Sequence, residues 1–429
     1  MKITIIGSGH VGLVTGACFA DLGNEVMCMD QDIQKIKLLS RGKVPFFEPG
    51  LEELIRKNHA NKRLAFTSSI KEAIQFSEIL FLCVGTPPKE NGEADLSAIE
   101  RVAKVIAPCL TEYCLIVEKS TVPVETGLFL QKMIQQNLTR KIKFDIASNP
   151  EFLREGSAVH DFFNPDRIVL GVESEKAEEL LLEVYEPFKV PVIVTDIRSA
   201  EIIKHASNSF LAMKISFINL VSQYCSNVGA DVEKVAEGVG ADKRIGKSFL
   251  RAGIGFGGSC FPKDLAAFIK IGENLNIPCN LLKEVLEINE NQKMNFVNTV
   301  RSILKNIKNK RIAALGLAFK PDTDDMRYAP SIDILTKLRA DGAHIKAYDP
   351  FAIQEAKGNI KGIDYVEDVY EACKNADAAL ILTEWREFRD IDLRRLKRTL
   401  RRPIIIDGRN LYDPQEMKNL GFKYYSIGR

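Results

Sequence analysis

The first thirty residues constrain the fold more than any other part of this chain. The apolar run 3–6 is typical of a buried strand, and the glycine-rich stretch Gly7-Ser8-Gly9-His10-Val11-Gly12 follows it at once. Small and apolar residues at helical spacing fill 11–22, and a second strand over 25–30 ends in the carboxylate of Asp30. A strand, a glycine turn, a helix and a further strand form the repeating unit of a doubly wound parallel sheet, so the chain is predicted to begin with a Rossmann domain.

The glycines and Asp30 have the spacing of a dinucleotide site. Gly7 would make the turn, Gly9 would let the backbone approach a pyrophosphate, and Gly12 would let the helix pack closely on the strand. The N–H groups at the start of the helix favour an anion. Asp30 would accept hydrogen bonds from the ribose hydroxyls, and its charge would repel a 2′-phosphate. The pattern therefore predicts NAD rather than NADP.

Strands and helices alternate in two parts of the chain, with a helical part between them. Strands are predicted over 79–84, 115–119, 144–147, 312–317, 345–349, 378–382 and 404–407. From 199 to about 228, apolar residues recur every three or four positions without Gly or Pro, which predicts one long helix. We therefore predict an α/β protein with an N-terminal Rossmann domain (1–198), a central helical domain with one long helix (199–308) and a C-terminal Rossmann-like domain (309–429).

Charge and cysteine usage exclude several classes of protein. The 59 Lys and Arg against 57 Asp and Glu leave a formal net charge of +2, so nothing global favours nucleic acid or an anionic membrane as a partner. No apolar run approaches the ~18 residues that a membrane helix needs. The nine cysteines form no Cys-x-x-Cys pair, and the five histidines share no ligand spacing, so we expect reduced thiols, a cytoplasmic protein and no metal site.

The segment 255–264, Gly-Phe-Gly-Gly-Ser-Cys-Phe-Pro-Lys-Asp, is the most chemically suggestive one. Pro262 fits the first turn of a helix that runs to 275, so Cys260 would lie at the helix N-terminus. That position and the neighbouring Lys263 both favour the thiolate, the nucleophilic form of cysteine. Asp264 would cap the helix or hold a water. The alternative for Cys260 is the ordinary role of a single cysteine, a small buried apolar side chain.

Two pairs of residues four positions apart are further candidates. Lys204 and Asn208 would share one face of the long helix and could hold a developing oxyanion beside a thiolate, although a solvated face is the alternative. Glu151 and Glu155 come just after a strand end, where α/β sheets bind their ligands, although they could also be helix N-terminal charges.

The last domain has a different loop after its first strand. Instead of Gly-x-Gly-x-x-Gly, the stretch 316–323 carries Lys320, which could hold a phosphate by charge rather than by close backbone contact. A second nucleotide site is therefore plausible there.

These pieces, in this order and over essentially the whole chain, resemble the UDP-glucose/GDP-mannose dehydrogenase family. His10 stands where the family usually has Tyr, Glu125 where Gly is common, and Leu220 where many bacterial members have an acid. The segments that carry the resemblance are 7–12, 48–51, 84–88, 92–97, 119–123, 149–156, 210–212, 215–219, 255–264, 318–327 and 407–409.

The resemblance implies an enzyme that oxidises UDP-glucose at C6 to UDP-glucuronate, a four-electron reaction that uses two NAD. Cys260 would add to the intermediate aldehyde, and the thiohemiacetal would become a thioester that water hydrolyses. Lys204 and Asn208 would stabilise oxygen charge. Asp264, through a water held with Thr121, would accept a proton, and Glu151 would be the base for hydrolysis.

The resemblance also implies the residues that bind each ligand. Arg244 matches an arginine that reaches the substrate of a neighbouring subunit, which implies at least a homodimer with the long helix as its interface. Besides the glycine loop, the NAD contacts would be Val11, Asp30, Lys35, Thr86, Thr121, Glu155, Lys263 and Arg327. The remaining substrate contacts would be Glu151, Phe152, Leu153, Arg154, Glu155, Lys204, Asn208, Phe249, Leu250, Arg251, Ala252, Gly253, Gly257 and Lys320.

Other functions stay open. Within the family, UDP-N-acetylmannosamine and GDP-mannose are alternative substrates. A two-electron hydroxyacid dehydrogenase would also join a Rossmann domain to a long helix, but it needs neither Cys260 nor a second α/β domain. A non-catalytic nucleotide-sugar sensor could keep Lys320 and Arg244 without needing the thiolate.

Overall fold

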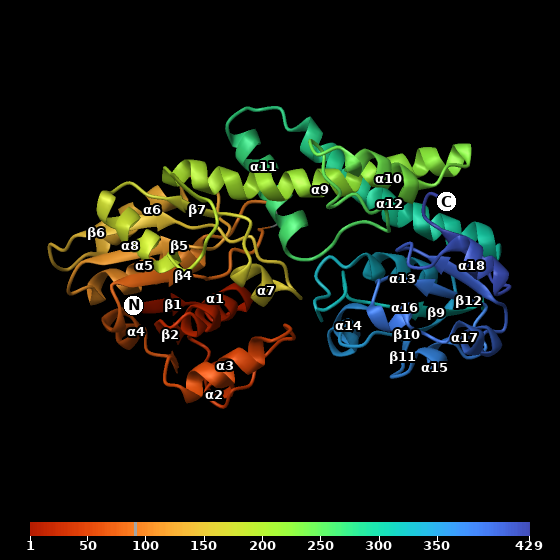
Figure 1. The fold of residues 1–429 in the computed structure, drawn as a ribbon, viewed down its shortest axis with the longest axis horizontal. Coiled ribbons are helices and arrows are strands. Elements are labelled where there is room, and N and C mark those ends of the chain that lie inside the picture. Colours follow the sequence, from red (N-terminus) through yellow and green to blue (C-terminus); the bar gives the residue numbers. More distant parts are fainter. Residues whose placement is uncertain (90–91) are drawn as a thin grey trace. The chain divides into compact units, whose positions relative to one another are not determined.

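Two units make up the fold in the computed structural model, which describes residues 1–89 and 92–429 (Figure 1). The first unit contains residues 1–207 and 266–276, and the second contains residues 208–265 and 277–429. Each unit is built around a sheet of its own.

The sheet of the first unit has eight strands in the order β3-β2-β1-β4-β5-β6-β7-β8. Neighbouring strands are parallel except β6 and β7, which meet antiparallel through Ser148 and Gly171. The order changes direction beside β1, so the carboxyl ends of β1 and β4 flank the crevice in which open α/β sheets bind ligands. The strands are β1 (Lys2–Ile6), β2 (Glu25–Met29), β3 (Leu64–Thr67), β4 (Ile79–Leu82), β5 (Cys114–Glu118), β6 (Phe144–Ser148), β7 (Ile168–Gly171) and β8 (Val192–Thr195).

Helices cover both faces of this sheet. Alternate residues of one strand enter different apolar cores, as Phe81 and Leu80 of β4 do, because side chains point to opposite faces along a strand. One core is completed by α1 (His10–Asp21), α2 (Ile33–Leu39), α3 (Leu51–Ala60), α7 (Ala158–Phe163) and α8 (Glu175–Tyr185). The other is completed by α4 (Ile70–Phe76), α5 (Ser97–Ile106) and α6 (Thr126–Asn137).

The second unit contains a six-stranded, wholly parallel sheet in the order β11-β10-β9-β12-β13-β14. Its strands are β9 (Arg311–Leu315), β10 (His344–Tyr348), β11 (Asp364–Tyr365), β12 (Ala378–Ile381), β13 (Ile404–Asp407) and β14 (Lys423–Ser426). Its accompanying helices are α13 (Pro330–Ala340), α14 (Ile353–Asn359), α15 (Val369–Cys373), α16 (Arg386–Arg389), α17 (Leu393–Thr399) and α18 (Pro414–Asn419).

Four longer or intervening helices form the helical part of the chain. The longest is α9 (Ile197–Val228), and α10 (Val232–Ala241), α11 (Cys260–Asn274) and α12 (Asn280–Leu304) follow it. Residues of α9 up to Ser207 belong to the first unit and the rest to the second. The C-terminal half of α12 buries Phe296 and Val300 in the core of the second sheet.

The predicted order of α/β, helical and α/β parts is confirmed. The first sheet is parallel as predicted, except where β6 and β7 meet antiparallel. The prediction also missed β3, β7, β8, β11 and β14. Of these, β11 has only two residues and β14 exposes alternate side chains, so neither forms the continuous apolar run that marks a buried strand. In contrast, β7 is a buried apolar run, Ile-Val-Leu-Gly, that the prediction overlooked.

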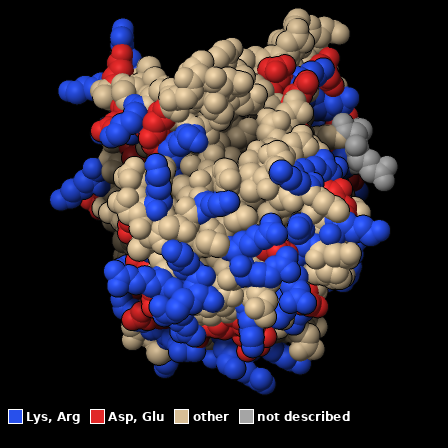
Figure 2. Space-filling model, turned by 90° about the vertical axis from the view of Figure 1, so that its right-hand side faces the viewer, with Lys and Arg blue, Asp and Glu red and all other residues tan. Residues whose placement is uncertain are grey.

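The surface carries its charges unevenly. Figure 2 shows Lys and Arg gathered on the side that the second unit presents to the viewer. Residues 386–402, which include α16 and α17, contribute eight exposed cations and only three acids, although the whole chain has a net charge of +2. In the part of the chain that the structure describes, no helix is long and apolar enough to cross a membrane.

Candidate active site

The glycine loop after β1 has the shape that a dinucleotide needs. Gly7 has φ +99°, and a Cβ there would lie 2.6 Å from the carbonyl oxygen of Cys83. A Cβ on Gly12 would lie 1.9 Å from the carbonyl oxygen of Gly7, whereas a Cβ on Gly9 would meet nothing within 4 Å. The packing of the protein itself thus requires Gly7 and Gly12. Gly9, at the N-cap of α1, leaves open space where a pyrophosphate could reach the helix N–H groups.

Asp30 follows β2 and is held in one orientation. One carboxylate oxygen accepts the backbone N–H of Ser8 (3.0 Å) and the ammonium of Lys35 (2.7 Å), and the other accepts the N–H of Asp32 (3.0 Å). Burial alone would raise the pKa of Asp30, but the hydrogen bonds from Lys35 and Asp32 outweigh it and lower the pKa below its ordinary value. The group is therefore an ionised acceptor at neutral pH, as a ribose contact requires.

Two threonines predicted to contact NAD lie at neighbouring strand ends. Thr86 follows β4 and is buried, and its hydroxyl donates to the carbonyl oxygen of Thr121, which follows β5, at 2.7 Å. The structure therefore brings these two sequence-predicted residues together at the carboxyl edge of the first sheet.

Lys204 and Glu151 form a buried ion pair in the first unit. The Lys204 ammonium lies 3.1 Å from a carboxylate oxygen of Glu151 and 2.5 Å from its backbone carbonyl oxygen, and both residues are less than a tenth exposed. The second carboxylate oxygen of Glu151 accepts the N–H of Leu153 at 2.6 Å. The alternative of a solvated face for Lys204 is therefore wrong, and no helix begins at Glu151 because α7 starts only at Ala158.

A buried glutamate that the sequence analysis did not single out organises the loop after Glu151. Glu48 accepts the N–H groups of Gly156 (2.7 Å) and Ala158 (2.8 Å), and one of its oxygens lies 2.7 Å from Nε2 of His10. It thus ties the glycine loop to the loop that carries Arg154 and Glu155. Its only signal in the sequence was the segment 48–51 of the family resemblance.

Cys260 is the first residue of α11, as predicted, and it is half-buried in the second unit. Its sulfur lies 3.8 Å from the Ser259 hydroxyl. The glycines before it are packed against the loop after β9: a Cβ on Gly257 would lie 2.3 Å from the carbonyl oxygen of Tyr328, and one on Gly258 would lie 2.7 Å from the Phe319 ring. Close packing, together with the positive φ of Gly258 (+80°), therefore explains the glycine-rich approach to the cysteine.

Asp264, one turn into α11, is almost completely buried and holds two of the other candidates. It accepts the side-chain amide of Asn208 at 2.6 Å, and its second oxygen lies 2.9 Å from the ammonium of Lys263. The contact with Asn208 was not expected from the sequence. Because Lys263 pairs with Asp264, it presents less of its charge to the Cys260 thiol than the sequence analysis assumed.

Arg409 belongs to the segment 407–409 of the family resemblance, but no role was predicted for it. Its guanidinium donates to the carbonyl oxygens of Leu382 (2.8 Å), Gly255 (3.2 Å) and Phe319 (3.2 Å). These bonds join the glycine loop before Cys260 to the loop that carries Lys320. Its position two residues after the carboxyl end of β13 was the available signal, since parallel strands place their functional residues at that edge.

Among the remaining substrate candidates of the second unit, the loop 249–253 is held by contacts with other parts of that unit. The Gly253 N–H donates to Asn219 at 2.9 Å, and Arg251 donates to the carbonyl oxygen of Arg409 at 3.0 Å, so the loop 249–253 is anchored from two sides. The ammonium of Lys320 lies 5.6 Å from the Phe319 ring. Arg244, by contrast, has a side chain that is 89% exposed and paired with Asp242.

The end of β10 shows how the second sheet differs from the first. Asp349 occupies the place that Asp30 has after β2, but it accepts the N–H groups of Leu317 (2.6 Å) and Ala352 (2.9 Å) and the indole N–H of Trp385 (3.1 Å). With these and two further backbone donors its oxygens are saturated, so it cannot bind a ribose as Asp30 can. A nucleotide in this unit would be bound differently.

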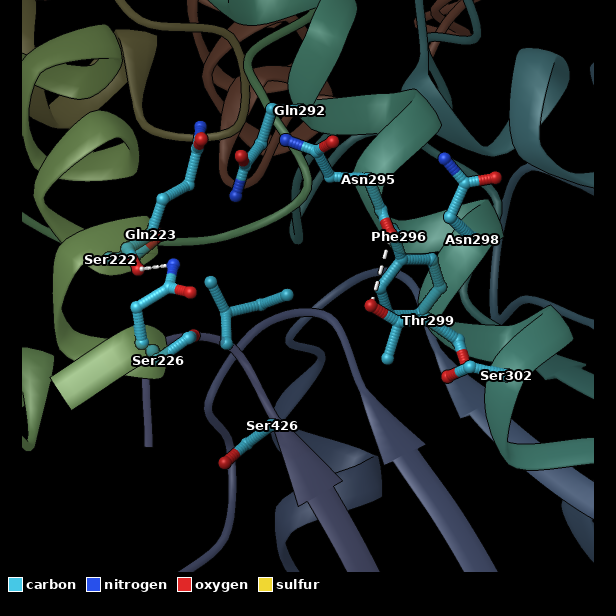
Figure 3. Close-up of a pocket in the computed structure, with 13 residues that line it drawn as sticks. Ser222, Gln223, Ser226, Gln292, Asn295, Phe296, Asn298, Thr299, Ser302 and Ser426 are labelled. Carbon is cyan, nitrogen blue, oxygen red and sulfur yellow. Dashed lines mark hydrogen bonds between the residues drawn. The ribbon is translucent and has the colours of Figure 1, made fainter. Parts of the chain in front are cut away.

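Figure 3 shows a pocket of about 390 Å³ in the second unit, between α9, α12 and the end of the chain. Its polar lining consists of uncharged amides and hydroxyls such as Gln223, Asn295 and Thr299. Its lining contains none of the predicted catalytic or binding residues and no Asp, Glu, Lys, Arg, His or Cys. The candidate catalytic residues thus lie at the strand ends and on α9 and α11, outside this pocket.

Three domain models of one family match successive parts of the chain. The NAD binding domain of the UDP-glucose/GDP-mannose dehydrogenase family matches residues 1–189, its central domain matches 198–291, and its UDP binding domain matches 313–414.

Relatives that align over the whole chain include proteins named UDP-glucose 6-dehydrogenase. A UDP-glucose 6-dehydrogenase of Bacillus subtilis is 50% identical and covers 100% of this chain and 93% of the relative, and one of Rhizobium meliloti is 46% identical and covers 100% of both. The solved structure of a UDP-glucose dehydrogenase from Pyrobaculum islandicum aligns with a TM-score of 0.93 at 37% identity (100% of this chain, 97% of that one). A UDP-D-ManNAc dehydrogenase from Pyrococcus horikoshii aligns with a TM-score of 0.88 at 26% identity (100% and 99%).

Proposed function

Because this chain belongs to the UDP-glucose/GDP-mannose dehydrogenase family, we propose that it oxidises the C6 alcohol of UDP-glucose to the carboxylate of UDP-glucuronate. The observation that carries the proposal is Cys260 at the first residue of α11, since only an oxidation that proceeds beyond the aldehyde needs a covalent thiol. A two-electron hydroxyacid dehydrogenase and a non-catalytic sensor have no use for this thiol.

The residues of the first unit fit NAD. Gly7, Gly9 and Gly12 shape the pyrophosphate site, and Asp30 provides an ionised acceptor for the ribose. Val11, Lys35, Thr86, Thr121, Glu155, Lys263 and Arg327 are the other residues proposed to contact NAD. When bound, NAD supplies the hydride acceptor of both oxidations.

Cys260 carries the substrate between the two oxidations. Its thiolate adds to the aldehyde carbon, the resulting thiohemiacetal loses hydride from that carbon, and the product is a thioester. Water attacks the thioester carbonyl, the C–S bond breaks, and UDP-glucuronate leaves while the thiol is restored. Lys204 and Asn208, one turn apart on α9, are proposed to stabilise the negative oxygen in these steps.

Proton transfer is assigned to three side chains. Asp264 and Thr121 share the task of accepting the alcohol proton through a water, and Glu151 removes a proton from the hydrolytic water. Glu151 suits this role because its carboxylate is held by Lys204 and by the N–H of Leu153. The substrate contacts proposed beside these residues are 152–155, 249–253, Gly257 and Lys320.

UDP-glucose is preferred to the other substrates of the family. Curated relatives of 42–50% identity act, by their names, on UDP-glucose, whereas the relative named for UDP-D-ManNAc is 26% identical. The test is the amount of NADH formed per nucleotide sugar consumed, compared among UDP-glucose, UDP-N-acetylmannosamine and GDP-mannose. We expect two NADH per UDP-glucose and no free aldehyde; a ratio of one, or preference for another sugar, would contradict the proposal.

We also propose that the protein is at least a homodimer that pairs through α9. Phe210, Phe217 and Tyr224 recur every seven residues and are each at least half exposed, with Val228 beyond them at 76%. A contiguous apolar stripe of this kind marks a surface that a second copy covers. The exposed Arg244 would then reach the substrate of the neighbouring subunit.

Three domains and a cytoplasmic location complete the proposal. The division is 1–198 for NAD, 199–308 for dimerisation and the catalytic cysteine, and 309–429 for the UDP-sugar, and the family models that match 1–189, 198–291 and 313–414 support it. The cytoplasm suits a mechanism that requires Cys260 as a thiolate, because this compartment keeps thiols reduced.

A further inference from the structure

Lys119 is a buried lysine that has no assigned role in the proposed reaction. It is the first residue after β5, is only 5% exposed, and donates to the side-chain oxygen of Asn149 at 2.9 Å and to the Tyr185 hydroxyl at 3.4 Å. In the described part of the chain no carboxylate forms an ion pair with it. Burying an ammonium whose hydrogen-bond partners are neutral costs free energy of folding. Stability of the fold therefore does not explain why a lysine occupies this position.

Asn149 connects Lys119 to Glu151, because it is hydrogen-bonded to Lys119 and lies two residues before Glu151. Its N–H donates to the carbonyl oxygen of Glu118 (2.8 Å), its amide donates to that of Val169 (2.9 Å), and its side-chain oxygen accepts Tyr185 as well as Lys119. Every polar group of this side chain is thus bonded. Only Pro150, whose φ is restricted by its ring, separates Asn149 from Glu151.

The same two-residue spacing to a proposed proton-transferring group occurs at the end of β5, where Lys119 itself lies. Thr121 follows Lys119 by two residues, as Glu151 follows Asn149 by two residues, and β5 and β6 are neighbours in the sheet. One buried cation therefore joins the two strand ends that carry two of the proposed proton-transferring groups.

The surroundings of Lys119 make its charge responsive to pH. Burial lowers the pKa of Lys119 to about 8, and the nearby ammonium of Lys204 acts in the same direction, whereas Cys83, Glu151 and Glu118 oppose the shift. Besides these four groups, the Tyr185 hydroxyl is the other titratable group that faces it. Above about pH 8 the cation next to Glu151 is therefore lost.

We propose that Lys119 is a positioning residue that, through Asn149, holds the Glu151 carboxylate in the orientation that thioester hydrolysis requires. The inference rests on the proposed function, because it assigns Lys119 to the step in which Glu151 acts. Lys119 touches neither ligand in this role and acts through Asn149 and through its charge.

Lys119→Met removes the charge and keeps the length of the side chain. We expect kcat with UDP-glucose to fall at least tenfold, the KM for NAD to stay within about twofold, and the Cys260 thioester to accumulate, which the intact mass of the protein reports. In the wild type, kcat should decrease above about pH 8 as Lys119 loses its proton, and we expect this decrease to be absent in Lys119→Met. Lys293→Met is the matched control, since Lys293 is also buried but pairs with Asp333 in the second unit, and it should leave all four readouts unchanged.

Asn149→Asp tests the charge if Lys119→Met does not fold. A carboxylate beside Lys119 retains the ammonium to higher pH, so the decrease of kcat should move upward by at least one pH unit. An unchanged pH profile in this variant, or a folded Lys119→Met without accumulated thioester, would overturn the inference. If the wild-type protein forms two NADH per UDP-glucose in the same assay, the proposed function stands even when the role of Lys119 is overturned. If the wild-type protein forms no NADH, both the proposed function and the role of Lys119 are overturned.

Discussion

At the scale of single residues, the proposed reaction depends on the ionisation of Cys260. Its place at the start of α11 puts the sulfur where the N–H groups of a helix stabilise negative charge. A serine hydroxyl at the same position is far less ionised at neutral pH, although its size is similar. The thiol chemistry can therefore be removed with little change to the fold.

We expect Cys260→Ser to bind NAD and UDP-glucose but to lose turnover by several orders of magnitude, and Cys260→Ala to form no covalent adduct. Steady-state kinetics and intact-protein mass after mixing with both ligands measure these outcomes. Cys279→Ser, at the N-cap of α12, is the control that should retain activity. If Cys260→Ala made UDP-glucuronate at near the parent rate, the thiol would be structural.

Asp30 and Lys35 together decide the choice of cofactor. The Asp30 carboxylate is proposed to accept the ribose hydroxyls, and it binds the Lys35 ammonium. In Asp30→Ala the bonds to the charged group are lost, which raises the KM for NAD roughly tenfold to a hundredfold. Lys35 is then released to meet a 2′-phosphate, so the ratio of NADP to NAD use should rise.

The ratio of kcat/KM for the two cofactors measures this change. Asp21→Ala, at the far end of α1, removes a carboxylate that pairs with Lys57 and should leave the ratio unchanged. Equal use of NAD and NADP by the unmutated protein would show that Asp30 does not select the cofactor.

At the scale of elements, Glu201 links the start of α9 to the start of α6. Its carboxylate accepts the N–H groups of Glu125 (2.7 Å) and Gly127 (2.9 Å), which begin α6. Glu125 adopts φ +74°, so the left-handed turn that favours glycine at this position is retained with a glutamate. Burial nevertheless outweighs the two hydrogen bonds and raises the pKa of Glu201 to about 7.

This shift predicts how stability depends on pH. A carboxyl group whose pKa is higher in the folded state than the ordinary 4.5 stabilises the fold fully below pH 4.5, and that contribution is lost as the pH rises through 7. Relative to Glu201→Gln, the wild type should lose up to about 3 kcal/mol of unfolding free energy between pH 4.5 and 8. Urea unfolding at both pH values measures the difference; parallel curves would mean that Glu201 does not carry this shift.

At the scale of the whole molecule, the exposed face of α9 predicts assembly. Phe217 lies in the middle of the apolar stripe, and Phe217→Arg would place a charge in an interface between two copies. We expect a shift from dimer to monomer in light scattering after gel filtration. Glu179→Arg on the exposed surface of α8 should leave the mass unchanged. A wild-type protein that is monomeric at micromolar concentration would contradict the proposed dimer.

The sequence alone determined the features that local chemistry controls. The glycine turn, α1 and Asp30 could be predicted because strand and helix periods, and the conformational freedom of glycine, act within thirty residues. Cys260 could be placed at a helix start because Pro262 lies two residues beyond it, and proline favours the first turn. The long α9 followed from an uninterrupted apolar period.

Only the tertiary structure decided the partners of the charged and polar groups. Lys204 meets Glu151 across 53 residues of chain, Asn208 meets Asp264 across 56, and Arg409 meets Gly255 across 154. The spacing of a charged residue along a helix is the same whether its face is solvated or buried, so burial and pairing depend on which elements pack against it. For the same reason Lys119, although part of the segment 119–123 of the resemblance, had no predicted role: an ammonium between two strand ends exists only once β5 and β6 lie side by side.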